Sequence, residues 1–171
     1  MGMFSKFLKH LKKDMKHLKK DAEILEGKRD GYSGAGIALF RKEADGSWAI
    51  LLGKRSIRQD FGKWSIPGGK VEKSDVSPLA GAKRELLEET GYRLDALDVA
   101  EAGCWHSDLL APFFAWDTFF YVFNGAELPA PNLKGYQEFS ELKWIPIKQL
   151  DNYELCHFVR EECKAFLEGA K

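Results

Sequence analysis

Three glutamates stand close together in the middle of the chain, at Glu85, Glu88 and Glu89. On a helix, spacings of three and four residues put their carboxylates within an arc of roughly 100°. There they repel one another and crowd the last turn, where the helix dipole disfavours negative charge. Each penalty is only about 0.3–1 kcal/mol, so an exposed acidic face would tolerate it. A divalent cation held between them is the alternative, because carboxylate oxygens are the ligands that magnesium and manganese prefer.

A Pro-Gly-Gly segment at residues 67–69 precedes these glutamates. Taken alone it indicates a tight turn, but glycines also let the backbone approach a ligand closely, and the Gly68 carbonyl can act as an oxygen donor. Arg84 lies four residues before Glu88 and can hold a carboxylate in one rotamer. Lys70 can reach a phosphate as a point charge. Together these residues indicate metal-assisted phosphate chemistry.

The helix that carries the glutamates can be located from its ends. Ser77 is a good N-cap, Pro78 suits the first helical position, and Gly91 suits a left-handed residue just past the C-terminus. The spacing predicts one buried face, formed by Leu79, Ala82, Leu86 and Thr90.

Residues 69–92 resemble the Nudix box, G-x5-E-x7-R-E-U-x-E-E-x-G-U, in which U is a bulky aliphatic residue. The second half of the pattern matches at Arg84, Glu85, Leu86, Glu88, Glu89 and Gly91. In the first half, Asp75 stands where the family has glutamate, and eight residues rather than seven separate it from the arginine. We place the extra residue in the loop 74–76 because the helix start is already well formed. Tyr92 replaces the last aliphatic residue, and the role of Asp75 is left open.

Similarity to the Nudix (MutT-like) hydrolases implies a Mg²⁺-dependent enzyme, with Mn²⁺ as a substitute. It would cleave a phosphoanhydride bond in a nucleoside diphosphate linked to another group and release a nucleoside monophosphate. We assign the metal to Glu85, Glu88, Glu89 and the carbonyl of Gly68. Arg84 would orient Glu85. The general base would be Glu85, Glu88 or the loop residue Glu138, with Glu141 as a weaker rival. The expected substrate-binding residues are Arg55, Gly69 and Lys70.

The substrate is less clearly encoded. Residues 51–69 partly resemble the coenzyme A pyrophosphatase signature, but Gly53 and Ile66 depart from it. A proline typical of ADP-ribose hydrolases and a tyrosine typical of dinucleoside polyphosphate hydrolases are missing. Nucleoside triphosphates or modified nucleotides are therefore favoured, with coenzyme A or a nucleotide sugar as alternatives. Several aromatic residues after the box belong to a core or a lid, or stack on a base; they are Trp105, His106, Phe113, Phe114, Trp116 and Phe119.

The remaining pattern predicts an α/β fold, a Nudix-type α/β/α sandwich around a mixed β-sheet. The expected strands are residues 36–40, 48–52, 99–105, 117–123 and 142–145, with a turn at Asp45-Gly46. A last helix is expected over Glu154–Leu167, with an apolar side formed by Leu155, Phe158, Val159, Phe166 and Leu167. Residues 31–171 form the expected hydrolase domain.

Residues 1–30 differ from that domain in charge and pattern. They hold nine Lys plus Arg against five acids, a net charge of +4, whereas the rest of the chain holds seventeen against twenty-one, a net charge of −4. A heptad seam predicts a basic amphipathic helix, with Phe4, Leu8, Leu11, Met15, Leu18, Ala22 and Leu25 on one side. This extra N-terminal helix could pack on its own domain or form a homodimer, lie on an anionic membrane surface, or bind a partner.

Other features limit the partners and the compartment. The formal net charge is zero, so no basic field favours nucleic acid. No signal peptide or long apolar run is apparent, and we expect a cytoplasmic protein, peripheral at a membrane if the basic helix binds lipid. Two non-enzymatic alternatives are a nucleotide-sensing Nudix module and a membrane-recruited adaptor. All three box glutamates are present together with Arg84, which favours the enzyme.

Overall fold

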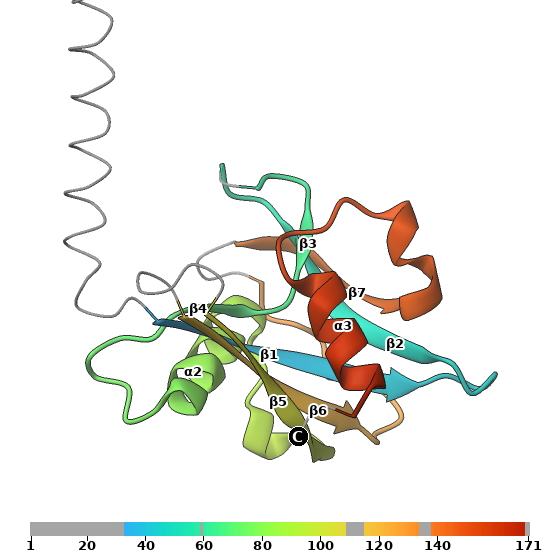
Figure 1. The fold of residues 1–171 in the computed structure, drawn as a ribbon, viewed down its shortest axis with the longest axis horizontal. Coiled ribbons are helices and arrows are strands. Elements are labelled where there is room, and N and C mark those ends of the chain that lie inside the picture. Colours follow the sequence, from blue (N-terminus) through green and yellow to red (C-terminus); the bar gives the residue numbers. More distant parts are fainter. Residues whose placement is uncertain (1–32, 59, 109–114, 134–137, 170–171) are drawn as a thin grey trace, which may run out of the picture. The chain divides into compact units, whose positions relative to one another are not determined.

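A computed structural model describes residues 33–58, 60–108, 115–133 and 138–169 of the chain. The fold described below belongs to one compact unit, which is formed by Ser33–Ser107 and Trp116–Lys171 (Figure 1). The basic helix predicted for residues 1–30 lies outside the described residues, so the proposed division at residue 30 stays a prediction.

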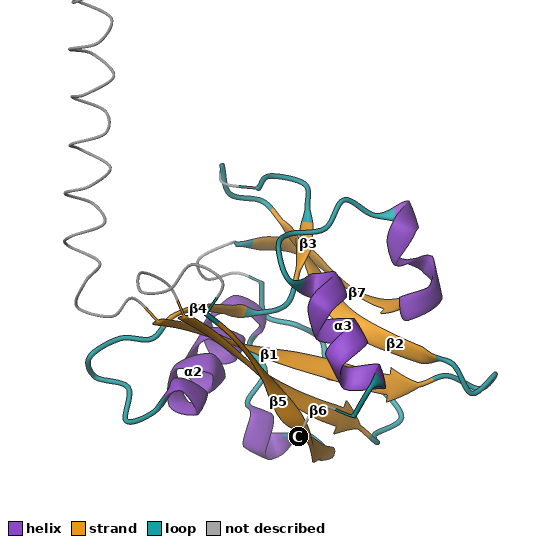
Figure 2. Ribbon diagram, viewed as in Figure 1, coloured by secondary structure: helices purple, strands orange, loops and turns teal. Residues whose placement is uncertain are grey.

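One mixed β-sheet organises this unit, as predicted (Figure 2). In the described part of the chain it has seven strands, in the order β3-β2-β1-β6-β5, while β4 pairs with β1 and β7 pairs with β2. The strands are β1 (Ser33–Lys42), β2 (Trp48–Arg55), β3 (Trp64–Ser65), β4 (Gly68–Lys70), β5 (Val99–Ser107), β6 (Ala115–Phe123) and β7 (Phe139–Pro146). Each of the five predicted strands lies within one of these. The predicted turn joins β1 to β2, with Gly46 at φ 81°.

The two faces of the sheet bury two separate cores because side chains alternate along β1. Ala35, Ile37 and Leu39 pack with Ala82 and Leu86 of helix α2 (Pro78–Thr90). Ala38 and Phe40 instead pack with Val159 and Cys163 of helix α3 (Val159–Leu167), and Phe40 stacks on Phe166 with ring centroids 3.7 Å apart. The two helices therefore cover opposite faces, which is the predicted sandwich.

Helix α2 has the predicted ends. The Ser77 hydroxyl accepts a hydrogen bond from the Ala80 N–H at 3.1 Å, Pro78 is in the first turn, and Gly91 has φ 78°. Ala82, Leu86 and Thr90 are fully buried, and Leu79 packs against the same core. The cap and the buried face together set the rotation of the helix, and hence the direction in which its glutamates point.

The prediction for the last helix is wrong at its start. Residues 154–156 pair with β3: the Trp64 N–H donates to the Glu154 carbonyl at 2.8 Å, and the Cys156 N–H donates to the Trp64 carbonyl at 2.9 Å. Phe158 then has φ 74°, a left-handed conformation that ends the extended segment, and α3 begins at Val159. Leu167, expected on the apolar side, is 55% exposed. Two short 3₁₀ helices span Leu94–Ala96 and Ile147–Asn152.

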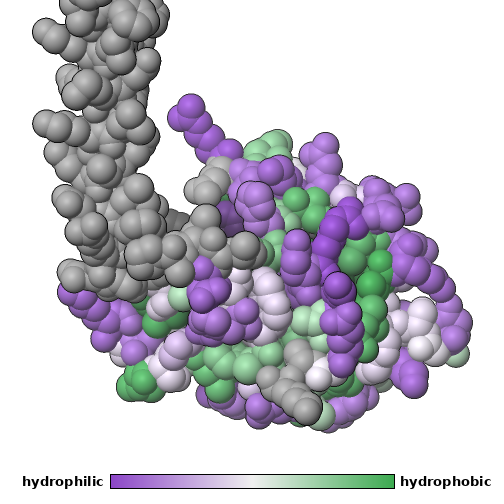
Figure 3. All heavy atoms as spheres, viewed as in Figure 1, coloured by the Kyte–Doolittle hydropathy of each residue, from purple (hydrophilic) through white to green (hydrophobic). Residues whose placement is uncertain are grey.

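The described surface gives no sign of a membrane span. No described helix is long and apolar enough to cross a bilayer. The face in Figure 3 is covered mainly by hydrophilic side chains, with smaller hydrophobic areas between them. Large hydrophobic side chains that are exposed include Phe61, Val76, Leu87 and Leu167.

Candidate active site

The glycine pair and helix α2 meet at strand β4. Gly68 pairs with Gly36 across β1 and β4, and its N–H donates a 2.8 Å hydrogen bond to the Glu89 carboxylate. A Cβ atom on Gly68 would lie 2.6 Å from the Gly36 Cα, and one on Gly69 would lie 2.6 Å from Glu85 Oε1. Gly68 therefore requires glycine because the backbone of β1 approaches it so closely, whereas a side chain at Gly69 would displace the Glu85 carboxylate.

Arg84 joins the helix to this turn. Its Nη1 donates to Glu85 Oε1 at 2.8 Å and to Glu88 Oε2 at 3.2 Å, while its Nη2 donates to the Lys70 carbonyl at 2.9 Å. One guanidinium thus sets the positions of two of the three box carboxylates and ties them to β4. Burial raises the pKa of Glu85, and the Arg84 contact opposes that rise.

The structure shows which groups Asp75 contacts, a question that the sequence pattern left open. Its carboxylate accepts from Arg84 Nε at 3.2 Å and from Nη2 at 3.0 Å, and it also accepts from the Glu72 N–H at 2.8 Å. The hydrogen bond from Arg84 lowers the pKa of Asp75 and in turn raises the pKa of the guanidinium. Gly81, which the sequence did not single out, leaves room for this pair, since a Cβ there would lie 2.9 Å from Asp75 Oδ2.

Glu138 and Arg55 join the site from other segments. The Glu138 carboxyl is hydrogen-bonded to that of Glu89, and Arg55 Nη2 lies 3.6 Å from Glu138 Oε2. The backbone fixes Glu138 as well, because its carbonyl accepts from the Ser56 N–H at 2.7 Å. Glu89 is only 4% exposed, and burial together with the Glu138 contact raises its pKa to about 9. Four segments of the chain therefore converge here: β4, α2, the end of β2 and the start of β7.

The donor set suits a divalent cation. A buried carboxyl that shares a hydrogen bond with a second carboxyl is costly unless a proton or a cation neutralises it, and the nearby Glu85 raises the pKa of Glu89 further. Carboxylate oxygens beside a backbone turn are the ligands that Mg²⁺ and Mn²⁺ take. In the present rotamers, no three His, Cys, Asp or Glu side chains of the described residues form a ligand cluster. Arg84 binds Glu85 and Glu88, so a metal would have to draw these carboxylates from it.

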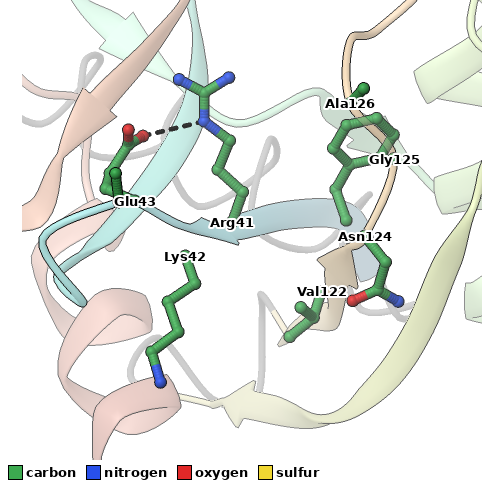
Figure 4. A pocket seen from close by; sticks show the side chains of 9 residues that line it. Arg41, Lys42, Glu43, Val122, Asn124, Gly125 and Ala126 are labelled. Atoms are coloured by element: carbon green, nitrogen blue, oxygen red, sulfur yellow. Dashed lines mark hydrogen bonds and ion pairs between the residues drawn. The ribbon is translucent and has the colours of Figure 1, made fainter.

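A pocket of about 400 Å³ lies at the other end of β1 (Figure 4). Arg41, Lys42 and Glu43 line it together with residues 122–126, and the Arg41 Nε donates to Glu43 Oε1 at 2.8 Å. None of the predicted site residues lines this pocket. Lys70, by contrast, is at the end of β4, exposed beside the box carboxylates.

Comparison with known proteins identifies the family of this chain. A model of the NUDIX domain family matches residues 32–163. The chain is 30% identical over 121 residues to an RNA pyrophosphohydrolase of Roseobacter denitrificans, a match that covers 62% of this chain and 73% of that protein. It is 41% identical over 58 residues to an uncharacterized 17.7 kDa protein of Enterobacteria phage T4, but this match spans only 38% of the phage protein.

Solved structures share the fold at low sequence identity. A bifunctional NMN adenylyltransferase/ADP ribose pyrophosphatase from Francisella tularensis has a TM-score of 0.65 at 20% identity, covering 80% of this chain and 40% of that one. A C. elegans Ap4A hydrolase has a TM-score of 0.60 at 18% identity, covering 81% and 98%. The NUDIX domain of Shewanella oneidensis NrtR, complexed with ADP ribose, has a TM-score of 0.58 at 20% identity, covering 80% and 86%. With the family match spanning the glycine turn, the Arg84 fork and all three box glutamates, the chain belongs to the Nudix family as a hydrolase of pyrophosphate bonds.

Proposed function

We propose that this chain is a Mg²⁺-dependent hydrolase of a nucleoside diphosphate linked to another group, and that it releases a nucleoside monophosphate. The observation that carries the proposal is the pairing of the buried Glu89 with Glu138 beside the Gly68 turn. Such a pair is expensive unless a proton or a cation neutralises it, and we infer that a divalent cation takes the place of the proton when it binds.

The proposed ligands are Glu85, Glu88, Glu89 and the Gly68 carbonyl, with Mn²⁺ able to replace Mg²⁺. The bound ion would offset charge on the phosphate oxygens and lower the pKa of a bound water. Arg84 would hold Glu85 and Glu88 ready, since it already contacts both. Lys70 and Gly69 would face the phosphates at the end of β4.

We propose Glu138 as the general base. Glu85 and Glu88 both accept hydrogen bonds from Arg84 and are proposed metal ligands, so both carboxylates already have positively charged partners. Among the described residues Glu138 forms no ion pair with Arg84, and its side chain is 32% exposed next to Arg55. Arg55 would then bind a phosphate of the substrate while keeping Glu138 in place.

The substrate class that we favour is a nucleoside triphosphate or a modified nucleotide. The similarity to an RNA pyrophosphohydrolase adds an RNA that carries a pyrophosphate bond as a second candidate. Coenzyme A and nucleotide sugars are the alternative substrates. A cytoplasmic location, self-association and peripheral membrane binding through residues 4–25 are further proposals. Equal co-sedimentation of full-length and truncated chains with anionic liposomes would remove the membrane proposal.

A substrate screen with site variants tests the assignment. The panel contains ATP, ADP-ribose, Ap4A, coenzyme A, UDP-glucose and a 5′-triphosphate oligoribonucleotide, each with Mg²⁺ and with Mn²⁺. Glu88→Gln and Glu89→Gln should lower turnover by about 100-fold or more, because ligand loss removes several kcal/mol of charge stabilisation. Glu141→Gln is the matched control, since Glu141 is an exposed acid on β7. Absence of turnover with every compound, or full activity of the two box variants, would refute the proposal.

A further inference from the structure

The six-membered ring of the Trp116 indole lies against Gly34 and Gly36 of β1, on the face opposite to helix α2. A Cβ atom on Gly34 would lie 2.4 Å from Trp116 Cε3, and one on Gly36 would lie 3.1 Å from Cζ2. Both glycines therefore leave the space that the ring occupies. Trp116 packs against the core on the α3 side and is only partly buried, so part of its surface is open to solvent.

This position borders the proposed phosphate site. The same Gly36 pairs with Gly68, whose N–H binds Glu89 on the other face of the sheet. Paired strands are about 4.8 Å apart, so the indole edge at Gly36 is one strand away from the glycine turn. Trp105 and Phe158, with ring centroids 5.4 Å apart, continue the aromatic surface on this face.

A buried hydrogen-bond chain holds the indole in this orientation. Trp116 Nε1 donates to Thr118 Oγ1 at 2.8 Å, and Thr118 Oγ1 donates to Glu162 Oε1 at 2.7 Å. Thr118 is 0% exposed and Glu162 is 1% exposed. The indole can only donate, so the threonine hydroxyl must accept from it and pass its own hydrogen to the carboxyl. Trp116 also contacts the Glu162 carboxyl directly, so the indole is tied to this carboxyl both through Thr118 and by its own N–H.

Glu162 is an unusual residue to bury at this place. Its Oε2 has no hydrogen-bond partner among the described residues, so the side chain carries a desolvation penalty that a leucine would avoid. Packing alone therefore does not explain a carboxyl here. What the carboxyl does supply is the acceptor that fixes Thr118, and through it the tilt of Trp116.

We propose that Trp116 forms a wall of the nucleoside subsite, on which the purine or pyrimidine ring of the substrate stacks, and that Glu162 is the positioning residue for this wall. The inference rests on the proposed function for the location of the phosphates. The proposal places the nucleobase on the α3 face of the sheet and the phosphates at the Gly68 turn.

The kinetic test compares a ligand that carries a nucleobase with a ligand that lacks one. AMP and ribose 5-phosphate are measured as competitive inhibitors of the wild type and of Trp116→Leu, using the best substrate of the panel. Loss of stacking should raise the inhibition constant of AMP, and KM, by about 10- to 100-fold. The inhibition constant of ribose 5-phosphate and kcat should change less than about threefold. Trp144→Leu is the matched control, because Trp144 packs on the opposite core.

The positioning role is tested by rescue at Glu162. Glu162→Gln keeps an acceptor oxygen for Thr118 and should retain the wild-type preference for AMP, whereas Glu162→Leu should lose it by about 5- to 20-fold. A merely structural role would instead weaken both inhibitors equally. Equal loss with both ligands, or an unchanged preference for AMP in Trp116→Leu, would overturn the inference.

A binding measurement separates this inference from the proposed function. The probe is 2-aminopurine riboside 5′-triphosphate, whose fluorescence is quenched when its base stacks on an indole. Quenching by the wild type but not by Trp116→Leu, without turnover of any substrate, would keep the subsite and refute the hydrolase. Turnover with equal quenching or none in both proteins would keep the hydrolase and refute the subsite. Neither quenching nor turnover would refute both.

Discussion

Glu162 should make this protein less stable as the pH rises, and Glu162→Gln should remove that loss. Burial raises the pKa of Glu162 to about 7, while Thr118 and Trp116 oppose the rise. Between the ordinary value of 4.5 and about 7, the folded protein keeps a proton on this carboxyl that the unfolded chain has already released. The contribution to stability is therefore complete below pH 4.5 and is lost as the pH rises through about 7.

The size of the effect follows from the same two pKa values. Each pH unit between 4.5 and about 7 lowers the free energy of unfolding by about 1.36 kcal/mol, which amounts to roughly 3 kcal/mol in total. Glutamine has the same shape but never ionises. The variant should therefore match the wild type to within about 1 kcal/mol at pH 4.5 and be roughly 3 kcal/mol more stable at pH 8. For a chain of 171 residues this corresponds to roughly 6–12 °C in Tm.

Urea unfolding of both proteins at pH 4.5, 5.5, 6.5, 7.5 and 8.5, in buffers that contain EDTA, measures this difference. Other titrating groups cancel because only the difference between the two proteins is used. Glu161→Gln provides the control: Glu161 is the exposed neighbour on the same helix, and its variant should run nearly parallel to the wild type. If the Glu162→Gln and wild-type stabilities stay parallel across this range, the buried carboxyl does not titrate as the structure indicates.

Three further predictions concern the box. Arg84→Lys should lower kcat/KM by about 10- to 100-fold, because lysine cannot hold Asp75 and the box carboxylates together; wild-type kinetics would contradict this. Gly69→Ala should displace Glu85 and cost about 100-fold in turnover with an unchanged circular dichroism spectrum, and full activity would show that the close approach is unimportant. Since burial and Glu138 raise the pKa of Glu89 to about 9, Mn²⁺ binding should release about one proton, so its calorimetric affinity should rise about tenfold per unit between pH 6 and 8.

Some contacts in this site cross long sequence separations, and these could not be predicted from the sequence. The box pattern named Arg84 and the carboxylates but not the bond from the Gly68 N–H to Glu89, 21 residues away. From the sequence, Glu138 was a loop acid that could be either a general base or an ordinary solvated side chain. Its contact with Glu89 depends on the pairing of β2 with β7, which places Phe139 opposite Arg55.

The start of the last helix also could not be predicted from the sequence. The apolar periodicity predicted a helix that begins at Glu154, because Leu155 and Phe158 fall at helical spacing. Pairing of residues 154–156 with Trp64 overrode that preference, since a backbone that bonds to a strand cannot also form a helix. The hydrogen bond between Thr118 and Glu162 joins residues 44 positions apart, so no local sequence pattern could predict it.

The sequence by itself determined what is local: the capped helix over Pro78–Thr90, its buried face, the strands with their alternation, and the box that identifies the family. These follow from cap chemistry, side-chain periodicity and residue spacing, all of which act over a few residues. The tertiary structure decided which groups meet. It paired Asp75 with Arg84, buried Glu89 against Glu138, and laid Trp116 across β1 above a buried glutamate. Such contacts depend on strand order and register, which bring distant segments together and are set only when the whole sheet closes around its two cores.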